Sequence, residues 1–344
     1  MTEILPLYVN EDGIPVVTQS MLKTFLECPR KTMYKYADRL KPKSQAKPLK
    51  RGGWIHTLLE SHYRGNDWRD AHKILSLQFD ELFDEEKDTL GDLPVEIREI
   101  MRSYFWHYEN DRDWKVLEVE LMVEVELPRV GLYRGKLDLL VETPFGLYVV
   151  DHKSNRTLPN TDFRLRDAQS ALYLWACRKA GYPVDGFIWN YIKYVAPKQV
   201  RFNLNGSLSK RQGETTYDTA YRSIRRQERD PRDYRDLLAP LRRQRYVHGG
   251  PQLSPFFKRS TLEKDDDMLK QAVGEAIHTS RRMNRYPFLN RRVVERNNTR
   301  ACDWCTYRDL CTVELFAGNV QNVLKGFRQG DPLEYYYDIK EETP

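Results

Sequence analysis

The segment from Val116 to Leu127 alternates apolar and polar residues, which is the period of a half-buried strand. The alternation places Leu117, Val119, Leu121, Val123, Val125 and Leu127 on one face and Glu118, Glu120, Glu124 and Glu126 on the other. Two apolar runs follow, one carrying Gly135 to Asp138 and one carrying Val149 to Lys153, with a turn predicted at Pro144, Phe145 and Gly146. A helix from about Arg166 to Ala180 and a strand from Gly186 to Val195 are expected next. The order strand, strand, strand, helix, strand predicts an α/β unit.

The flanking regions are predicted to be mostly helical. Spaced apolar residues between Ser20 and Tyr36 predict a short helix that Ser20 caps and Pro29 interrupts. A polar linker from Lys41 to Lys50 precedes the start of another helix, and residues 67–108 have apolar positions at helical spacing. Residues 208–285 are expected to be largely helical and basic, with a break near residues 249–251.

The composition indicates a globular chain that stays out of membranes. Charged residues make up 31% of the 344 positions and hydrophobic residues 40%, and no stretch is apolar for the length of a membrane span. The first residues, MTEILPLYVNEDG, lack the basic start and apolar run of a secretory signal. We therefore expect a cytoplasmic protein, in which disulfides are disfavoured.

The net charge of +6 is a small excess, but its distribution along the chain is uneven. Arginine clusters in the second half, at Arg225-Arg226, Arg242-Arg243-Gln244-Arg245, Arg281-Arg282 and Arg291-Arg292, with tyrosines between the clusters. Any single cluster is explained by a solvated helix face paired with nearby acids. The set as a whole favours DNA, since arginine with aromatic residues suits phosphate contacts and base stacking.

Polar residues interrupt the two central apolar runs. Asp151 and Lys153 lie on the same face of a strand because their spacing is two residues, and Asp138 can approach them from the preceding strand. Two carboxylates and an ammonium that converge at the edge of a sheet suit a divalent cation, an anionic phosphate and an attacking water.

These residues resemble the motifs of the PD-(D/E)XK nucleases, in particular the RecB-like branch with AddB-type and CRISPR-associated exonucleases. Gly135 to Asp138 match G-h-h-D, Asp151 to Lys153 match D-x-K, and Gln169 to Tyr173 match Q-x-x-x-Y. The resemblance implies a restriction-endonuclease-like core, a central mixed sheet flanked by helices, with helical insertions. It also implies a metal-dependent DNA nuclease, and membership of this branch leads us to expect exonuclease action.

The resemblance further implies a role for each site residue. Gly52 to His56 fit the family's G-x-x-x-H, which makes His56 a metal ligand beside Asp138, Asp151 and the backbone carbonyl of His152. The ion is Mg²⁺ or Mn²⁺, and imidazole ligation fits manganese somewhat better. Lys153 would orient the attacking water or stabilise the pentacovalent phosphorus, while Gln169 and Tyr173 support the site and contact DNA. Glu120 could assist from the first strand, but a solvated row of glutamates is the favoured reading.

The cysteines predict a second centre. Cys302, Cys305 and Cys311 have the C-x2-C-x5-C spacing of a metal site, and Cys28, in Cys28-Pro29-Arg30, can supply a fourth ligand. Ligand chemistry alone leaves Zn²⁺ and a [4Fe-4S] cluster close to each other, and the resemblance favours the cluster. A four-cysteine clamp would then join the two ends of the chain. Cys177 is expected to pack in the core.

Three functional readings follow, of which a DNA nuclease acting in recombination, repair or processing is favoured. The alternatives are a non-catalytic DNA-binding subunit and a metal-stapled structural or redox protein. The sequence lacks G-x-x-x-x-G-K-[ST], so any helicase or recombination motor is expected to be a separate partner. The expected divisions are an N-terminal arm at 1–45, a helical region with the histidine at 46–115, the nuclease core at 116–200, a basic helical region at 201–296, the cysteine segment at 297–316 and a C-terminal tail at 317–344.

Overall fold

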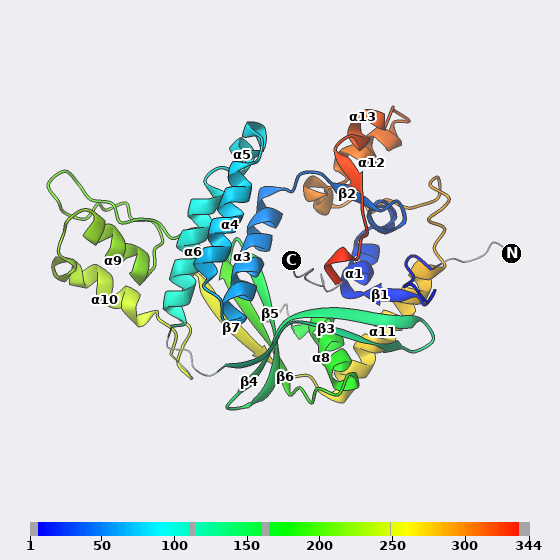
Figure 1. Cartoon of the computed structure of the whole chain (residues 1–344), viewed down its shortest axis with the longest axis horizontal. Helices are drawn as coiled ribbons and strands as arrows, with labels where there is room; N and C mark the ends of the chain where they lie inside the picture. Colours follow the sequence, from blue (N-terminus) through cyan, green and yellow to red (C-terminus); the bar gives the residue numbers. More distant parts are fainter. Residues whose placement is uncertain (1–5, 110–113, 160–164, 248, 337–344) are drawn as a thin grey trace, which may run out of the picture.

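The computed structural model describes residues 6–109, 114–159, 165–247 and 249–336, so the expected C-terminal tail is described only as far as Tyr336. Its centre is a mixed sheet in the order β1-β4-β5-β6-β7, with β3 on the other edge of β4 (Figure 1). The strands are β1 Val16–Thr18, β3 Lys115–Leu127, β4 Gly131–Thr143, β5 Gly146–Asn155, β6 Gly186–Lys193 and β7 Phe257–Leu262. Helix α8, Ala168–Lys179, connects β5 to the parallel strand β6. The α/β fold with a mixed central sheet flanked by helices is confirmed.

Strand β4 changes partner halfway along its length. β3 pairs with it antiparallel from Gly131 to Glu142, which occupies one edge of the strand. On the other edge, β1 pairs parallel with Leu132 to Arg134, and β5 pairs antiparallel with Leu139 to Thr143. The residues between Arg134 and Leu139 therefore lie where the sheet opens between β1 and β5. The motif from Gly135 to Asp138 falls in this gap.

Two helical layers cover the sheet. On one side lie α3 Lys47–Tyr63, α4 Trp68–Asp80 and α6 Leu93–His107, whose apolar residues pack with Ile192 of β6 and Phe257 of β7. On the other side lie α1 Gln19–Glu27, α8 and α11 Asp266–Asn284, which pack against Phe187 and Trp189 of β6. Alternate residues of β6 thus face opposite layers, as the period of a strand requires. The short helix α5 Asp84–Leu90 connects α4 to α6.

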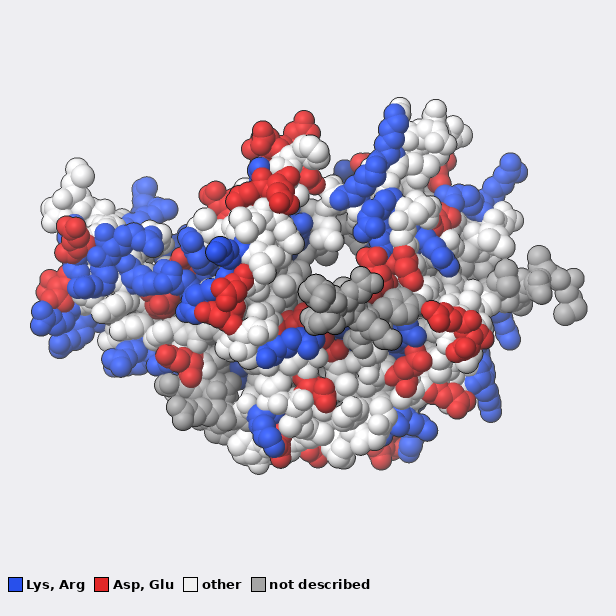
Figure 2. Space-filling model, viewed as in Figure 1, with Lys and Arg blue, Asp and Glu red and all other residues white. Residues whose placement is uncertain are grey.

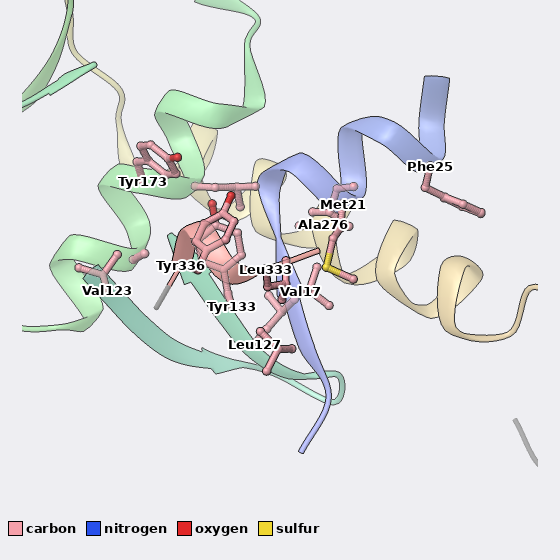
Figure 3. Packing of buried hydrophobic residues seen from close by; sticks show 14 of the residues in the cluster. Val17, Met21, Phe25, Val123, Leu127, Tyr133, Tyr173, Ala276, Leu333 and Tyr336 are labelled. Atoms are coloured by element: carbon pink, nitrogen blue, oxygen red, sulfur yellow. The ribbon is translucent and has the colours of Figure 1, made fainter. Parts of the chain in front are cut away.

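The C-terminal part of the chain returns to the N-terminal part. β8, Phe327–Gln329, pairs antiparallel with β2, Leu40–Pro42. Beyond it, Leu333 is fully buried, and Tyr336 of the 3-10 helix Glu334–Tyr336 lies beside Tyr133 in the same cluster as Val17 (Figure 3). The segment 327–336 is therefore part of the main hydrophobic core.

The chain between β6 and β7 forms a lobe that extends from the body beside α6 (Figure 1). It contains α9 Tyr217–Arg226, the 3-10 helix Pro231–Tyr234 and α10 Arg235–Arg243. Val200, Ala220, Ile224 and Leu238 make a small core of its own. We call residues 197–246 the insertion lobe.

Shorter elements complete the N- and C-terminal regions. After α1 the chain continues through α2 Pro29–Thr32 and the π-helical turn Met33–Ala37, and after α11 through the 3-10 helix Arg300–Trp304, α12 Arg308–Leu315 and α13 Gln321–Leu324. The predicted interruption at Pro29 is confirmed, since α1 ends at Glu27. No helix in the described ranges is both long and apolar enough to cross a bilayer.

Three sequence expectations were wrong in detail. Thr18, not Ser20, caps α1, because its hydroxyl accepts from the Met21 N–H at 3.2 Å. Leu117 is 42% exposed, because a register shift between Val116 and Glu118 moves it off the apolar face of β3. The strand β7 interrupts the region that was expected to be helical from residue 208 to 285.

Candidate active site

Strand β5 carries the first part of the site. Asp151 and Lys153 lie on the same face, as their spacing predicts, and the Lys153 ammonium is 2.6 Å from Asp151 Oδ2. The Asp151 side chain is 5% exposed and that of Lys153 is 27% exposed. The ammonium also lies 5.4 Å from the centroid of the Trp189 ring on the neighbouring strand. The carboxylate is therefore buried, while the cation beside it reaches solvent.

Asp138 enters from the gap in β4. Its Oδ2 accepts the backbone N–H of His152 at 2.6 Å, which fastens the carboxylate to β5. Its Oδ1 lies 3.5 Å from Nδ1 of His56, which projects from α3. The structure therefore brings His56, Asp138, Asp151 and Lys153 together from α3, β4 and β5. Two of these contacts involve Asp138, which lies where β4 is paired with neither β1 nor β5.

The two carboxyl groups have opposite pKa shifts. Burial opposes ionisation of Asp138, but the charge and hydrogen bond of His56, to which Lys153 adds, outweigh burial and lower the pKa of Asp138. Burial raises the pKa of Asp151 to about 6, and the neighbouring Asp138 adds to the rise against the opposing effect of Lys153. Burial alone would lower the pKa of His56, yet Asp138 raises it. Asp138 is thus the more strongly ionised of the two acids.

Helix α8 closes the site from the opposite layer. Asp167 caps the helix by accepting the Gln169 N–H at 2.8 Å, and the Gln169 side-chain amide donates to Asp151 Oδ1 at 2.7 Å. Tyr173, one turn later, packs over Gly135: a methyl group on Gly135 would lie 3.3 Å from its ring. Gln169 therefore supports β5 through a hydrogen bond, and Tyr173 supports β4 through packing.

The side chain of His152 faces the helical layer, where its ring centroid lies 6.0 Å from that of His56. Its ring stacks on Tyr63 of α3 at 5.7 Å and 11°, and its Nδ1 lies 2.8 Å from the side-chain nitrogen of Asn190. Asn190 in turn donates to the Tyr104 hydroxyl on α6 at 2.8 Å. Burial lowers the pKa of His152 to about 3, so the ring is neutral. The imidazole thus anchors β5 to the helical layer, and the backbone of His152 faces the site.

Glu120 was expected in a solvated row, and that expectation is wrong. Its side chain is 8% exposed and 3.0 Å from the Lys136 ammonium. The pairs Val119 with Leu139 and Leu121 with Leu137 place Glu120 at the register position of Asp138. Its φ of 57° is a left-handed conformation that is strained for a side-chain-bearing residue. Regular alternation cannot reveal this local departure. Glu118, Glu124 and Glu126 are exposed as expected.

A second neighbour of the site comes from the far end of the chain. The ring of Tyr335 lies 4.4 Å from the Lys136 ammonium, and its hydroxyl donates to Glu120 at 3.4 Å. Burial raises the pKa of Tyr335, and the nearby carboxylates of Asp138 and Glu120 add to the rise. No motif pointed to Tyr335, because its position follows from the packing of segment 327–336 and not from its local sequence.

The four cysteines lie in segments that the fold brings together. Asn297 donates to the Glu27 carbonyl at 2.8 Å, and Arg30 pairs with Glu314 at 3.2 Å, so the chain around Cys28 contacts the chain around Cys302 to Cys311. All four thiols are partly exposed and free. Burial raises the pKa of Cys305, with Cys28 and Cys302 adding to the rise. Cys177 is fully buried in the core, as expected.

The described ranges contain no group of three or more His, Cys, Asp or Glu side chains arranged to hold a metal ion. At the cysteines, the thiols are not gathered into a ligand cluster. At the site on the sheet, the carboxylate oxygens are engaged by protein groups: His56 and the His152 N–H at Asp138, and Gln169 and Lys153 at Asp151. The donor set of two buried carboxylates and an imidazole nevertheless fits a divalent ion of the Mg²⁺ or Mn²⁺ kind.

The chain matches a known superfamily of nucleases. The family model for the PD-(D/E)XK nuclease superfamily matches residues 16–312, so the chain belongs to this superfamily. A putative exonuclease from Eubacterium rectale is 13% identical, covers 84% of this chain and 92% of its own, and has a TM-score of 0.42. A phage-related exonuclease from Haemophilus somnus 129PT is 13% identical, with coverages of 75% and 93% and a TM-score of 0.27. No curated protein matches the sequence.

Proposed function

We propose that this member of the superfamily is a metal-dependent DNA exonuclease that hydrolyses phosphodiester bonds. One observation carries the proposal: Asp138, Asp151 and Lys153 converge where the sheet opens between β1 and β5. Buried carboxylates beside a solvent-reaching ammonium suit a reaction in which a cation and an anionic phosphate meet. A purely structural ion pair would not require the additional contacts from His56 and Gln169.

Asp138 and Asp151 are the proposed ligands of Mg²⁺ or Mn²⁺, with His56 and the backbone carbonyl of His152 completing the protein's share of the shell. The ionised state of Asp138, maintained by His56, supports this assignment. A bound divalent ion supplies Lewis acidity, which lowers the pKa of a coordinated water and neutralises charge that develops on the phosphate. The remaining steps depend on how the protein positions its own groups.

Lys153 is the proposed electrostatic partner of the phosphate. Its ammonium, held between Asp151 and the Trp189 ring, can orient the attacking water and stabilise negative charge on the phosphoryl oxygens. Gln169 fixes the rotamer of Asp151 through its amide hydrogen bond. Tyr173 packs α8 against Gly135, which keeps Gln169 within hydrogen-bond distance of Asp151. The role of the last two residues is positioning.

The proposed biological setting is DNA recombination, repair or processing, with DNA as the partner. Exonuclease action and this setting come from the resemblance of the sequence motifs to the RecB-like branch. Because the sequence contains no phosphate-binding loop, unwinding would require a separate helicase or recombination protein.

For the cysteines, we propose a structural metal centre held by Cys28, Cys302, Cys305 and Cys311, with [4Fe-4S] favoured over Zn²⁺. The contacts of Asn297 with Glu27 and of Arg30 with Glu314 support the idea that the two segments share one centre. Metal binding by residues so distant in sequence would contribute directly to folding. Phosphodiester hydrolysis needs no redox change, so the centre would serve stability.

The test of the proposed function is a nuclease assay on end-labelled linear DNA and on circular DNA, with Mg²⁺ and with Mn²⁺. We expect metal-dependent release of the terminal label and survival of the covalently closed circle. Cleavage of the circle would replace exonuclease with endonuclease action. Absence of cleavage of either DNA with either metal, with DNA binding retained, would overturn the proposal in favour of a non-catalytic DNA-binding subunit.

A further inference from the structure

The insertion lobe contains the basic excess of the whole protein. Residues 197–246 include 13 Lys and Arg against 6 Asp and Glu, a net charge of +7, whereas the complete chain has a net charge of +6. The rest of the molecule therefore has a net charge of −1. On the face shown in Figure 2, Lys and Arg predominate on the lobe, with a few acidic side chains among them, while the body shows both signs interspersed.

Most of these cations have no ion-pair partner among the described residues. Arg222, Arg229, Arg232 and Arg245 are engaged by acids or by groups of the protein itself. The remainder are exposed and form no ion pair with a described residue: Lys198, Arg201, Lys210, Arg211, Arg225, Arg226, Arg235, Arg242 and Arg243. By contrast, Arg291 of a cluster outside the lobe pairs with Asp38 and Glu314. The interpretation that the arginines pair with nearby acids on solvated helix faces therefore holds for Arg291. It does not hold for most arginines on the surface of the lobe.

Aromatic rings form a stack beside these arginines. Trp106 of α6 stacks on Tyr217 at 4.9 Å and 20°, and Tyr217 stacks on Tyr221 at 5.9 Å and 24°. The guanidinium of Arg245 lies 4.8 Å from the Trp106 ring, at the inner end of the stack. Tyr221, at the outer end, is 40% exposed. A flat apolar group can therefore extend the stack at Tyr221.

The lobe is fixed to the body through α6. Arg222 pairs with Glu99 at 2.7 Å, and the Ser103 hydroxyl lies 2.9 Å from that of Thr216. Tyr104 of the same helix accepts from Asn190, which contacts His152 in the candidate active site. One helix thus connects the lobe to the strand that bears Asp151. A ligand held by the lobe would approach the sheet in a defined orientation.

We propose that the insertion lobe is a DNA-binding arm, in which the exposed arginines bind phosphates and Tyr221 stacks on a base of single-stranded DNA. This inference rests on the proposed function for the identity of the polymer. Many exposed cations without protein partners suit a repeating polyanion, and an open aromatic stack suits an unpaired base. A folded acidic protein would use the cations but leave the exposed ring of Tyr221 without a counterpart.

The experiment measures DNA binding in EDTA, where metal-dependent cleavage is off. The probes are a fluorescein-labelled oligothymidine of about 30 nucleotides and a duplex of the same length. The test variant replaces four exposed arginines by glutamine: Arg225, Arg226, Arg242 and Arg243. We expect roughly ten- to hundred-fold weaker binding near 0.1 M salt and a salt slope that is smaller by roughly two to three.

Two matched controls show whether a loss of binding comes from the lobe surface itself or from the lower net charge or from misfolding. The first replaces exposed cations of the body by glutamine, with the same loss of charge: Lys43, Lys73, Arg129 and Lys179. The second replaces the same four lobe arginines by lysine, which keeps the charge. Both are expected to bind within about three-fold of the wild type.

A third pair of variants tests the stack. Tyr221→Ala should weaken binding of the oligothymidine by about five-fold or more, while Tyr221→Phe, which keeps the ring, should not. Duplex affinity should change little in either variant. Equal loss for single-stranded and duplex DNA would remove the stacking role and leave only phosphate contacts.

Two results would contradict the proposal of a DNA-binding arm. In the first, the glutamine variant of the lobe binds both probes with wild-type affinity and salt slope. In the second, the body control loses as much affinity as the lobe variant. Either result is compatible with the proposed nuclease function as long as the wild-type protein cleaves DNA. A protein that binds through the lobe but cleaves no DNA with either metal would instead support the arm and refute the proposed reaction.

Discussion

The two charged regions of the molecule are built on opposite principles. In the candidate active site the Asp138 and Asp151 side chains are 8% and 5% exposed. Each contacts two protein groups: Asp138 contacts His56 and the His152 N–H, and Asp151 contacts Lys153 and Gln169. On the insertion lobe most arginines are exposed and form no ion pair with a described residue, and several of them lie on the short helices α9 and α10 around a small core.

The two regions differ in how strongly the role of a charged side chain depends on its exact position. A buried charge is costly unless its partners are in place, so residues of the site depend on one another and on the fold. Exposed cations are individually weak and act as a sum, so loss of one is compensated by the others. Substitutions in the two regions should therefore differ in size, in additivity and in the assay that detects them.

The largest effect should come from the site on the sheet. Asp138→Ala, Asp151→Ala and Lys153→Ala should each slow cleavage by roughly 10³-fold or more, because each removes a group that acts on the same charged centre. Single-turnover cleavage of labelled DNA at saturating enzyme measures this loss. Combined pairs should lose far less than the product of the single effects.

Stability provides the control for these variants. Since burial raises the folded-state pKa of Asp151 to about 6, its ionised form opposes folding above that pH, and Asp151→Asn should not lower the thermal midpoint at pH 7.5. A large drop in that midpoint would indicate that Asp151 is a structural ion-pair partner, and the activity loss would then have no catalytic meaning.

His56 tests the link between the helical layer and the metal. His56→Ala should reduce cleavage by about 10- to 100-fold at limiting metal and recover part of it at high Mn²⁺, because a ligand is lost while both carboxylates remain. Titrations of activity against metal concentration give the comparison. Unchanged metal dependence with lowered stability would make His56 a packing residue only.

The cysteine segments should affect stability more than chemistry. Cys302→Ser should lower the thermal midpoint by roughly 5 °C or more and reduce bound iron, since metal binding would contribute to folding. Cys177→Ala, at a buried thiol outside the four, should leave metal content unchanged. Broad absorption near 400 nm with about four irons per chain is expected, as a cubane cluster requires. About one zinc per chain would keep the clamp but replace the cluster. Absence of both metals would refute the centre.

The smallest effect concerns the junction of body and lobe. Burial, with Arg259 and Arg245 nearby, lowers the pKa of His107 from 6.5 to about 3 in the folded state. The unfolded chain therefore binds a proton more readily, and stability should fall as pH decreases from 6.5 towards 3. His107→Phe should flatten this dependence partly, since His152 has a shift of the same sign. Chemical denaturation at several pH values measures the slope, and an unchanged slope in the variant would contradict the assignment.

Local sequence patterns predicted where several residues of the candidate site lie on their strand and helix. Period two placed Asp151 and Lys153 on one face, and helical spacing placed Gln169 and Tyr173 together, because both patterns depend only on regular backbone geometry. The order of β3, β4, β5, α8 and β6 was likewise readable from alternation and turn signals.

The remainder depends on irregular or long-range structure. Glu120 faces the site through a left-handed backbone position, and Leu117 leaves the apolar face at a register shift, neither of which a regular pattern contains. Tyr335 reaches Lys136 because Leu333 is buried in a core formed mostly by residues far away in sequence. The partner change of β4 that opens the sheet at Asp138 also becomes visible only when β1 and β5 are placed.

The most direct test measures cleavage and binding on the same two proteins, Asp151→Asn and the variant with glutamine at Arg225, Arg226, Arg242 and Arg243. If chemistry resides on the sheet and DNA is held by the lobe, Asp151→Asn should bind DNA in EDTA like the wild type and cleave roughly 10³-fold more slowly with Mg²⁺. The lobe variant should bind at least about ten-fold more weakly yet cleave at the wild-type single-turnover rate once saturated. Undiminished cleavage by Asp151→Asn would contradict the account.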